Sequence, residues 1–250
     1  MKIHVQSVLL GSLLVTSIGL LFSFQQVMNA THFGLTSEQK AVLDILSVET
    51  LPDGMNGPGY KTLRVNGVNL QVVNGVDDDT SNGLGNILVG YMIRTSDSNG
   101  SHNVVTGSVQ KYTANASILG GYGNEVNAAY GIVFGTDNIV DSPFGTILGG
   151  VQNLVSVTNG DPGMIVCGNT NTVYGPNSSI LCGQFNTTNN SFGVIVGGQA
   201  NVNNGVHGVI VGGTNNAIGT LGSNAVLGGG NTRTATGVDD WVAGSLFEDN

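Results

Sequence analysis

The sequence predicts an all-β fold, a parallel β-solenoid in the form of a two-sided roll with coils of about 15 residues. The first observation behind this prediction is a seven-residue pattern that recurs eight times from residue 118 to residue 231. The pattern begins with an aliphatic pair and has glycine in fourth and asparagine in seventh place.

The second observation is the spacing of the motif glycines, which is 14, 15, 18, 15, 15, 15 and 15 residues. The third is a content of 40 glycines with only 9% charged residues, which is unusual for a globular enzyme. The motif glycines are Gly121, Gly135, Gly150, Gly168, Gly183, Gly198, Gly213 and Gly228. The motif asparagines are Asn124, Asn138, Asn153, Asn171, Asn186, Asn201, Asn216 and Asn231.

Each part of the repeat has a chemical reason. A coil of this length has room for two short strands and two turns, whereas three-sheet β-helices need longer coils and hexapeptide prisms need about 18 residues. The glycine allows a turn in which a Cβ would clash. The asparagine can bond the neighbouring backbone and stack, coil over coil, as an amide ladder. An aliphatic residue two positions after the asparagine often marks the second strand, as at Val126, Val140, Val155, Val173 and Ile218.

Less regular coils extend the array at both ends. The segments ILVG at 87–90 and VVTG at 104–107 precede the eight motifs, and WVAG at 241–244 follows them. Eleven coils stacked at about 4.8 Å give a rod roughly 50 Å long. Trp241 begins the last coil, and we expect it to cap the open end of the core, as terminal repeats must.

The aliphatic pair of each motif predicts an oligomer. Successive strand residues point to opposite faces, so the two members of the pair form two columns. One column is Ile118, Ile132, Ile147, Ile165, Ile180, Ile195 and Ile210. The other is Leu119, Val133, Leu148, Val166, Leu181, Val196 and Val211. Only one column can fill the interior of the roll, and the other forms an apolar wall too large for a soluble monomer to expose. Identical chains are the economical cover for it, which indicates a closed symmetric oligomer.

The segments before the repeats divide the chain further. We expect residues 1–30 to be a signal peptide or a membrane anchor, 31–56 a short helix and linker, 57–81 a β-hairpin segment with an acidic loop, and 82–250 the β-roll. An uncharged apolar run at 7–24 follows Lys2, and a cut after Ala30 would complete an export signal. The same run is long enough to span a bilayer uncleaved. The expected location is therefore the cell surface or the outside medium.

Two local patterns define the N-terminal elements. Residues 36–49 are typical of a helix, with Thr36 and Gln39 in a capping-box pattern and one apolar stripe. The stripe would pack either on its own domain or in a short coiled-coil seam between copies. Residues 57–75 alternate as strands around Asn66-Gly67, a strong hairpin signal. The acidic run 77–79 is typical of a solvated loop.

The charge pattern excludes two classes of partner. The net charge is -9, and Arg233 is the only basic side chain after Lys111. Nucleic-acid binding needs Lys or Arg to displace counterions from phosphates, so we expect none. Attraction to anionic lipid headgroups fails for the same reason, which leaves the N-terminal segment as the one membrane contact.

The two cysteines leave two interpretations open. Cys167 and Cys182 each lie directly before a motif glycine, 15 residues apart, so they are expected to stack on adjacent coils. Neighbouring strands bring Cα atoms to about 4.8 Å, within disulfide range, but in-register Cβ atoms remain slightly far apart for an unstrained bridge. Export favours oxidation. The pair is therefore either a disulfide or two buried thiols.

Nothing else in the sequence forms a recognisable catalytic, cofactor or metal site. The four histidines, His4, His32, His102 and His207, are scattered. His102 is expected to order a loop. The acids of the coils, Glu125, Asp137, Asp141 and Asp161, lie on different turns without an adjacent pair, which disfavours a glycosidase. Calcium would depend only on loop acids at 77–79 and 239–240.

The repeat resembles the head domains of trimeric autotransporter adhesins, the YadA-like β-roll, whose short coils also pair an aliphatic strand with a turn glycine. The segments NGLGNILVGY at 82–91 and GSHNVVTG at 100–107 are similar to the entry into such repeats in exported bacterial proteins. The resemblance implies a left-handed roll and a homotrimer. The sequence has no stalk and no membrane barrel of that family after the last coil. We therefore expect that the N-terminal segment anchors the protein, that the protein is released, or that it joins a larger assembly.

These observations predict a non-enzymatic, exported, trimeric β-roll that acts as a surface adhesin or a structural appendage subunit. A host or matrix glycan or protein is the expected contact partner, bound by the outer face and by irregular loops such as the insertion at 155–163. The alternative is a polysaccharide-binding or polysaccharide-degrading solenoid module of a virion fibre or a secreted protein. An ice-binding rod is a third interpretation, but it would need flat threonine ranks.

Overall fold

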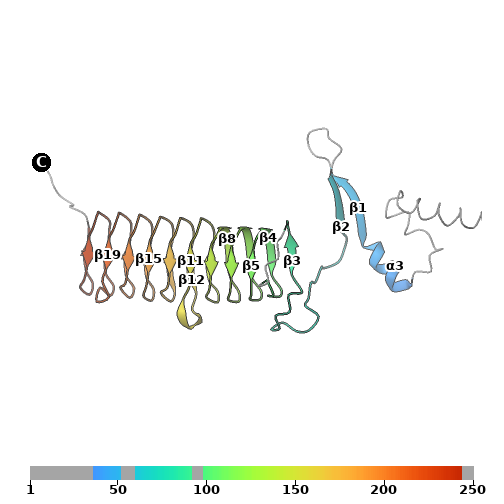
Figure 1. The fold of residues 1–250 in the computed structure, drawn as a ribbon, viewed down its shortest axis with the longest axis horizontal. Coiled ribbons are helices and arrows are strands. Elements are labelled where there is room, and N and C mark those ends of the chain that lie inside the picture. The colour runs from blue at the N-terminus through green and yellow to red at the C-terminus, as the bar shows by residue number, and fades with distance from the viewer. Residues whose placement is uncertain (1–35, 52–59, 92–97, 244–250) are drawn as a thin grey trace, which may run out of the picture. The chain divides into compact units, whose positions relative to one another are not determined.

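The computed structural model describes residues 36–51, 60–91 and 98–243. They divide into an N-terminal unit that ends at Gln71 and a second unit that begins at Val72. Figure 1 shows the helix and hairpin of the first unit and the stacked coils of the second.

The N-terminal unit opens with helix α3 (Ser37–Asp44), which the capping box starts as predicted. The Thr36 hydroxyl accepts the Gln39 N–H at 3.2 Å, and the Gln39 side chain accepts the Thr36 N–H at 2.9 Å. The helix is shorter than the expected 36–49 because Ile45 caps its end. Val42 remains 57% exposed, so the described part of this unit does not cover the expected apolar stripe.

The hairpin of this unit is not the one that the sequence predicted. Strand β1 (Leu46–Leu51) pairs antiparallel with β2 (Tyr60–Val65), and Asn66-Gly67 lies beyond the pairing instead of at the turn. The register Leu46↔Val65 and Val48↔Leu63 gathers four aliphatic side chains on one face. Six continuous residue pairs with matched faces therefore outweigh the local turn signal, and no strand forms at 68–73.

The second unit is a parallel β-solenoid with two sheets, as predicted. One sheet has eleven strands and the other nine. In spatial order the eleven-stranded sheet contains β3 (Ile87–Val89), β4 (Val104–Ser108), β6 (Ile118–Tyr122), β8 (Ile132–Thr136), β10 (Thr146–Ile147), β12 (Gly163–Ile165), β14 (Ser178–Ile180), β16 (Val194–Ile195), β18 (Val209–Ile210), β20 (Val226–Leu227) and β22 (Trp241–Val242). The nine-stranded sheet contains β5 (Lys111–Tyr112), β7 (Glu125–Val126), β9 (Ile139–Val140), β11 (Leu154–Val155), β13 (Thr172–Val173), β15 (Thr187–Thr188), β17 (Val202–Asn203), β19 (Ala217–Ile218) and β21 (Thr234–Ala235). The short 3-10 helix η1 (Thr158–Gly160) lies in the insertion between β11 and β12.

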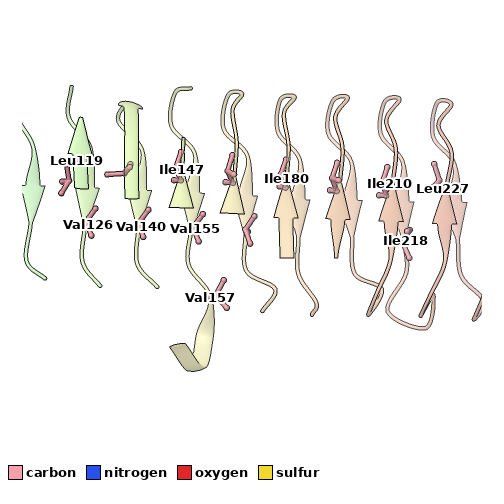
Figure 2. Packing of buried hydrophobic residues seen from close by; sticks show 14 of the residues in the cluster. Leu119, Val126, Val140, Ile147, Val155, Val157, Ile180, Ile210, Ile218 and Leu227 are labelled. Carbon is pink, nitrogen blue, oxygen red and sulfur yellow. The ribbon is translucent and has the colours of Figure 1, made fainter. Parts of the chain in front are cut away.

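The core is a narrow strip between the two sheets, with one buried inward side chain from each strand except β3 and β22 (Figure 2). From the eleven-stranded sheet the buried residues are Val105, Leu119, Val133, Ile147, Ile165, Ile180, Ile195, Ile210 and Leu227. From the nine-stranded sheet they are Tyr112, Val126, Val140, Val155, Val173, Thr188, Asn203, Ile218 and Ala235. The five second-strand residues that the sequence singled out are all among them.

The two aliphatic columns exchange roles near residue 140. From Ile147 onward the first residue of the pair is buried, as at Ile195, and the second faces outward, as at Val196. In the two earlier motifs Leu119 and Val133 are the buried ones, and Val133 pairs directly with Ile147. The earlier motifs have one residue fewer between the buried position and the glycine, so keeping both in register moves the inward position by one.

The stacked glycines form a column along one turn. Ten of them, from Gly90 to Gly230, have φ between 87° and 122°, where a side chain would be strained. A Cβ on any of the ten except the last would meet the carbonyl oxygen of the glycine in the next coil. This close approach explains why the position is glycine in every coil.

The asparagine ladder runs beside the glycines. Asn186 is representative: its Nδ2 donates to Asn171 Oδ1 at 3.1 Å and to Gly198 O at 3.0 Å. Its own Oδ1 accepts the Asn201 backbone N–H at 3.0 Å. The same backbone-to-amide bond joins each motif asparagine from Asn124 to Asn216, all of them buried. The ladder therefore satisfies the buried polar groups of the turn coil by coil.

In the last motif the stacked residues lie two positions later in the sequence than predicted. Gly230, not Gly228, stacks on Gly213, and the Arg233 N–H, not that of Asn231, donates to Asn216. Leu227 pairs with Ile210, so this step is 17 residues long. The shift places a leucine in the strand core where the literal motif would have placed the smaller Ala225.

Trp241 does not cap the core as expected. It lies on β22 in register with Val226 and is 70% exposed, with its side chain on the outer side of the sheet. Within the described residues, its neighbour Val242 packs against the core instead.

Candidate interaction surfaces

The outer side of the eleven-stranded sheet is apolar along most of its length, and we call it the apolar face. Two outward columns flank the inward one. The first column is Ile87, Val104, Ile118, Ile132, Thr146, Met164, Ser179, Val194, Val209, Val226 and Trp241. The second contains Phe134, Leu148, Val166, Leu181, Val196 and Val211, of which Leu148 is 50% exposed. This face contains the apolar wall that the sequence predicted.

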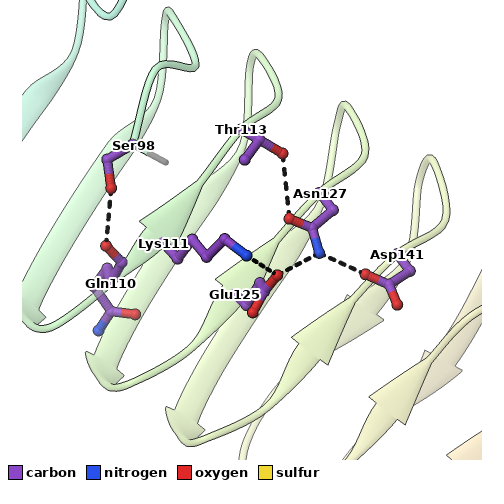
Figure 3. A network of polar contacts seen from close by, with 7 residues as sticks. All are labelled: Ser98, Gln110, Lys111, Thr113, Glu125, Asn127 and Asp141. Atoms are coloured by element: carbon purple, nitrogen blue, oxygen red, sulfur yellow. Dashed lines mark hydrogen bonds and ion pairs between the residues drawn. The ribbon is translucent and has the colours of Figure 1, made fainter. Parts of the chain in front are cut away.

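The outer side of the nine-stranded sheet is polar at the start of the array, and we call it the polar face. Further along, aliphatic side chains at Ile139, Leu154, Val202 and Ala217 also point outward there. Lys111 forms an ion pair with Glu125 at 2.6 Å, and Asn127 donates to Glu125 at 2.6 Å (Figure 3). Asn127 also donates to Asp141 at 2.7 Å and accepts from Thr113 at 3.2 Å. Polar side chains here bond one another from coil to coil.

Two acids that the sequence placed apart are neighbours in the structure. Glu125 and Asp141 both accept from the Nδ2 atom of Asn127, so their carboxylates share one donor on the polar face. The two acids lie on different coils, as the sequence indicated, and they share a donor because the register sets Asn127 opposite Asp141 of the next coil. Lys111 and Asn127 already bond the Glu125 oxygen, which gives the pair a structural part in the network. Asp137 is separate, in a turn with φ 53°.

The structure joins Cys167 and Cys182 in a disulfide, with Cα atoms 4.7 Å apart. Of the two interpretations left open, the bridge is the one observed. Each cysteine occupies the place that Gly149, Gly197 and Gly212 take in other coils, directly before the stacked glycine. The bridge links two successive coils of the eleven-stranded sheet.

Reduction of this disulfide is expected to lower the melting temperature of the oxidised protein. A bridge that closes a 15-residue loop contributes about 3 kcal/mol, which corresponds to roughly 6–12 °C for a chain of this size. Thermal unfolding followed by circular dichroism with and without reductant measures it. The control is the double variant Cys167→Gly and Cys182→Gly, which carries the residue of neighbouring coils and should not respond to reductant. An unchanged melting temperature of the wild-type protein would contradict the prediction.

The remaining titratable candidates do not converge. The Nε2 atom of His102 accepts the Asn74 N–H at 3.3 Å, so this histidine does order the loop before the array. The Thr80 side chain and the Thr80 backbone N–H lower the pKa of Asp77, which closes the acidic loop on itself. Within the described ranges, no three His, Cys, Asp or Glu side chains are grouped closely enough to hold a metal ion. His4 and His32 lie outside those ranges.

Sequence reasoning missed a row of exposed aromatic residues at the second turn of the coils. Tyr130 stacks on Phe144 with ring centroids 5.0 Å apart, and Phe192 stacks on His207 at 4.9 Å. All four have φ between 57° and 64° and directly precede a glycine. The recurring ring-glycine dipeptide was the signal that would have found them.

Comparison with models of known protein families gives no match, and comparison with curated proteins gives no significant match. The fold alone defines the class: the chain contains a parallel β-solenoid of about 15-residue coils, preceded by a short helix and a β-hairpin. None of the described helices is long and apolar enough to cross a membrane. The first 35 residues, which include the expected export signal, lie outside the described residues.

Proposed function

We propose that this protein is an exported, non-enzymatic β-roll that assembles as a homotrimer and acts as a surface adhesin or a structural appendage subunit. The single observation that carries the proposal is the contrast between the two outer faces of the solenoid. The apolar face extends from Ile87 to Val226, interrupted at Thr146 and Ser179, whereas the polar face bonds its own side chains at Lys111, Glu125 and Asn127. Exposed apolar surface of this extent is typical of an interface.

A second copy of the chain is the partner that fits the apolar face best. The face is built by repetition, so an identical face offers the same spacing of about 4.8 Å per coil. When each chain packs its apolar face against the faces of the other copies around a symmetry axis, the assembly is closed and no apolar wall remains in water. The likeness of the repeat to YadA-like adhesin heads supports three copies and a left-handed roll.

The proposed role as an adhesin or appendage subunit follows from the rigidity and the exposed surfaces of the solenoid. The coils are held by backbone ladders, a buried asparagine column and a disulfide, which together make a stiff support. With its apolar face covered, an oligomer would present polar faces and irregular loops outward. These are the surfaces on which an adhesin or appendage subunit makes its contacts.

The oligomeric state tests the proposal directly. Light scattering coupled to size exclusion, on the chain from residue 31 onward, is expected to give about three times the mass of one chain. The mass should not change with salt, because the contacts proposed are apolar and are not screened. A stable, soluble single chain would overturn the proposal.

A further inference from the structure

The inference starts from the edge of the apolar face, where the second turns of successive coils stack. Ala116, Tyr130, Phe144, Asn177, Phe192 and His207 occupy equivalent places there, all with positive φ. Between Phe144 and Asn177 the chain makes its insertion, and Pro162 takes the equivalent place, since Gly163 and Ser178 are in register. In Figure 1 this insertion projects between β11 and β12, beyond the turns of its neighbours. Two pairs of stacked rings therefore bracket an irregular gap.

A surface depression of ≈ 370 Å³ lies in this gap. The Phe144 ring, the Pro162 ring and Met164 provide apolar lining, and Thr146, Asn177 and Ser179 provide polar groups. Tyr130 stacks on Phe144 at an interplanar angle of 11°, which fixes a ring that is still 54% exposed. The volume and the few polar groups beside an aromatic ring are features of small-ligand sites.

The polar groups of the depression are exceptions within their column. Thr146, Met164 and Ser179 are successive members of the first outward column, and the members on either side, Ile132 and Val194, are aliphatic. Within the described residues, neither hydroxyl has a hydrogen-bond partner, nor does the side-chain amide of Asn177. The fold does not need these groups, since aliphatic residues serve the same strand position in neighbouring coils.

We infer that this depression, between Phe144 and the insertion, binds a neutral glycan. A sugar ring has an apolar face of C–H bonds that packs on an aromatic face and a rim of hydroxyls that need partners. Phe144 and Met164 match the apolar face, and Thr146, Asn177 and Ser179 match the rim. A ligand of purely apolar chemistry would leave those three groups desolvated without partners, at a free-energy cost.

Charge selects neutral sugars over anionic ones. The chain has a net charge of -9 and no lysine or arginine between Lys111 and Arg233. Asp161 directly precedes Pro162, which lines the depression. A sulfate or uronate group would therefore meet a like charge and no cation.

The inference deepens the proposed function by naming the class of ligand. It rests on that function with one condition: the aliphatic stretches of the apolar face form the trimer interface, and the edge at Thr146, Met164 and Ser179, where the aliphatic column is interrupted, stays outside it. The experiments distinguish failure of the proposed trimer from failure of the glycan site. A trimer that binds no glycan overturns the site and leaves the assembly. A single chain that binds glycan at Phe144 overturns the assembly and leaves the site.

The test uses saturation-transfer NMR on the chain from residue 31 onward with neutral hexasaccharides of glucose, mannose, xylose and N-acetylglucosamine, followed by titration of each binder. Phe144→Ala is expected to weaken binding at least about tenfold, equivalent to about 1.4 kcal/mol. Ala116 shows that the turn accepts alanine. The double variant Thr146→Val and Ser179→Val, which restores the aliphatic column, is expected to weaken binding about tenfold through the loss of two hydrogen bonds.

The controls are a matched variant and a charged probe. Phe192→Ala removes a ring from the same column outside the depression and should leave the affinity within about twofold. A hexasaccharide of hyaluronan should bind more weakly than the neutral probes. The site is overturned if no neutral probe binds, if Phe144→Ala binds as well as the wild type, or if Phe192→Ala weakens binding equally. It is also overturned if Phe144→Ala lowers the mass in light scattering, because the depression would then seat a second copy.

Discussion

Val196→Asp is expected to convert the assembly into single chains. Val196 lies in the second outward column of the apolar face and is 40% exposed in the isolated chain. In the proposed trimer this side chain would be covered by another copy, so each chain would bury an unpaired carboxylate. Removing such a charge from water without a partner costs about 3–5 kcal/mol per chain. Light scattering measures the result as a fall from about three chain masses to one.

The matched control is Val202→Asp. Val202 is also a valine, six residues further along the same coil, but it faces outward on the polar face, between Thr187 and Ala217. This variant has the same loss of strand propensity and the same added charge as Val196→Asp. It should remain assembled because its carboxylate lies outside the proposed interface. If the two variants behave alike, assembly does not depend on the apolar face. If Val202→Asp alone dissociates, the interface lies on the opposite sheet.

Gly198→Ala is expected to destabilise the fold strongly, as a representative of the stacked glycines. Gly198 has φ +90°, and an added Cβ would overlap the carbonyl oxygen of Gly213 in the next coil. That oxygen accepts from Gln199 N at 2.9 Å and from Asn201 Nδ2 at 3.0 Å, so the overlap disrupts both bonds. Overpacking and backbone strain together should destabilise the protein by about 3–5 kcal/mol.

Gly197→Ala provides the control one residue away. An added Cβ at Gly197 has nothing within 4 Å. Cys167 and Cys182 already carry a Cβ at the equivalent place in two other coils. Its free energy of unfolding in urea should stay within about 0.5 kcal/mol of the wild-type value. Equal loss of stability in both variants would contradict the prediction, because Gly197 has no close neighbour and the loss could not then come from the stacking of coils at Gly198.

The amino-acid sequence determined the repeat. Because each coil must return to the same place every 14 to 18 residues, the period alone fixes parallel stacking, two short strands per coil, a glycine turn and an asparagine ladder. These are local consequences of chain geometry, repeated. The capping box at Thr36 was predicted for the same reason, since it depends on four neighbouring residues.

Tertiary packing decided the register. Leu119 and Val133 are buried, in place of Ile118 and Ile132, because a shorter coil must still align its inward side chain with Ile147. In the last motif Leu227, two residues after Ala225, pairs with Ile210, so the larger side chain takes the inward strand position. Likewise β1, and not the segment after Asn66-Gly67, pairs with β2 because its aliphatic side chains match across six residue pairs.

The candidate surfaces also depended on stacking. The pattern of each motif already indicated that one aliphatic column faces outward, but not that Thr146 and Ser179 would flank Met164 beside Phe144. Nor did it show that Asn127 would bridge Glu125 and Asp141, or which bond the two cysteines would form. A sequence specifies the contents of each coil, whereas contacts between coils depend on small differences in coil length that only the packed core resolves.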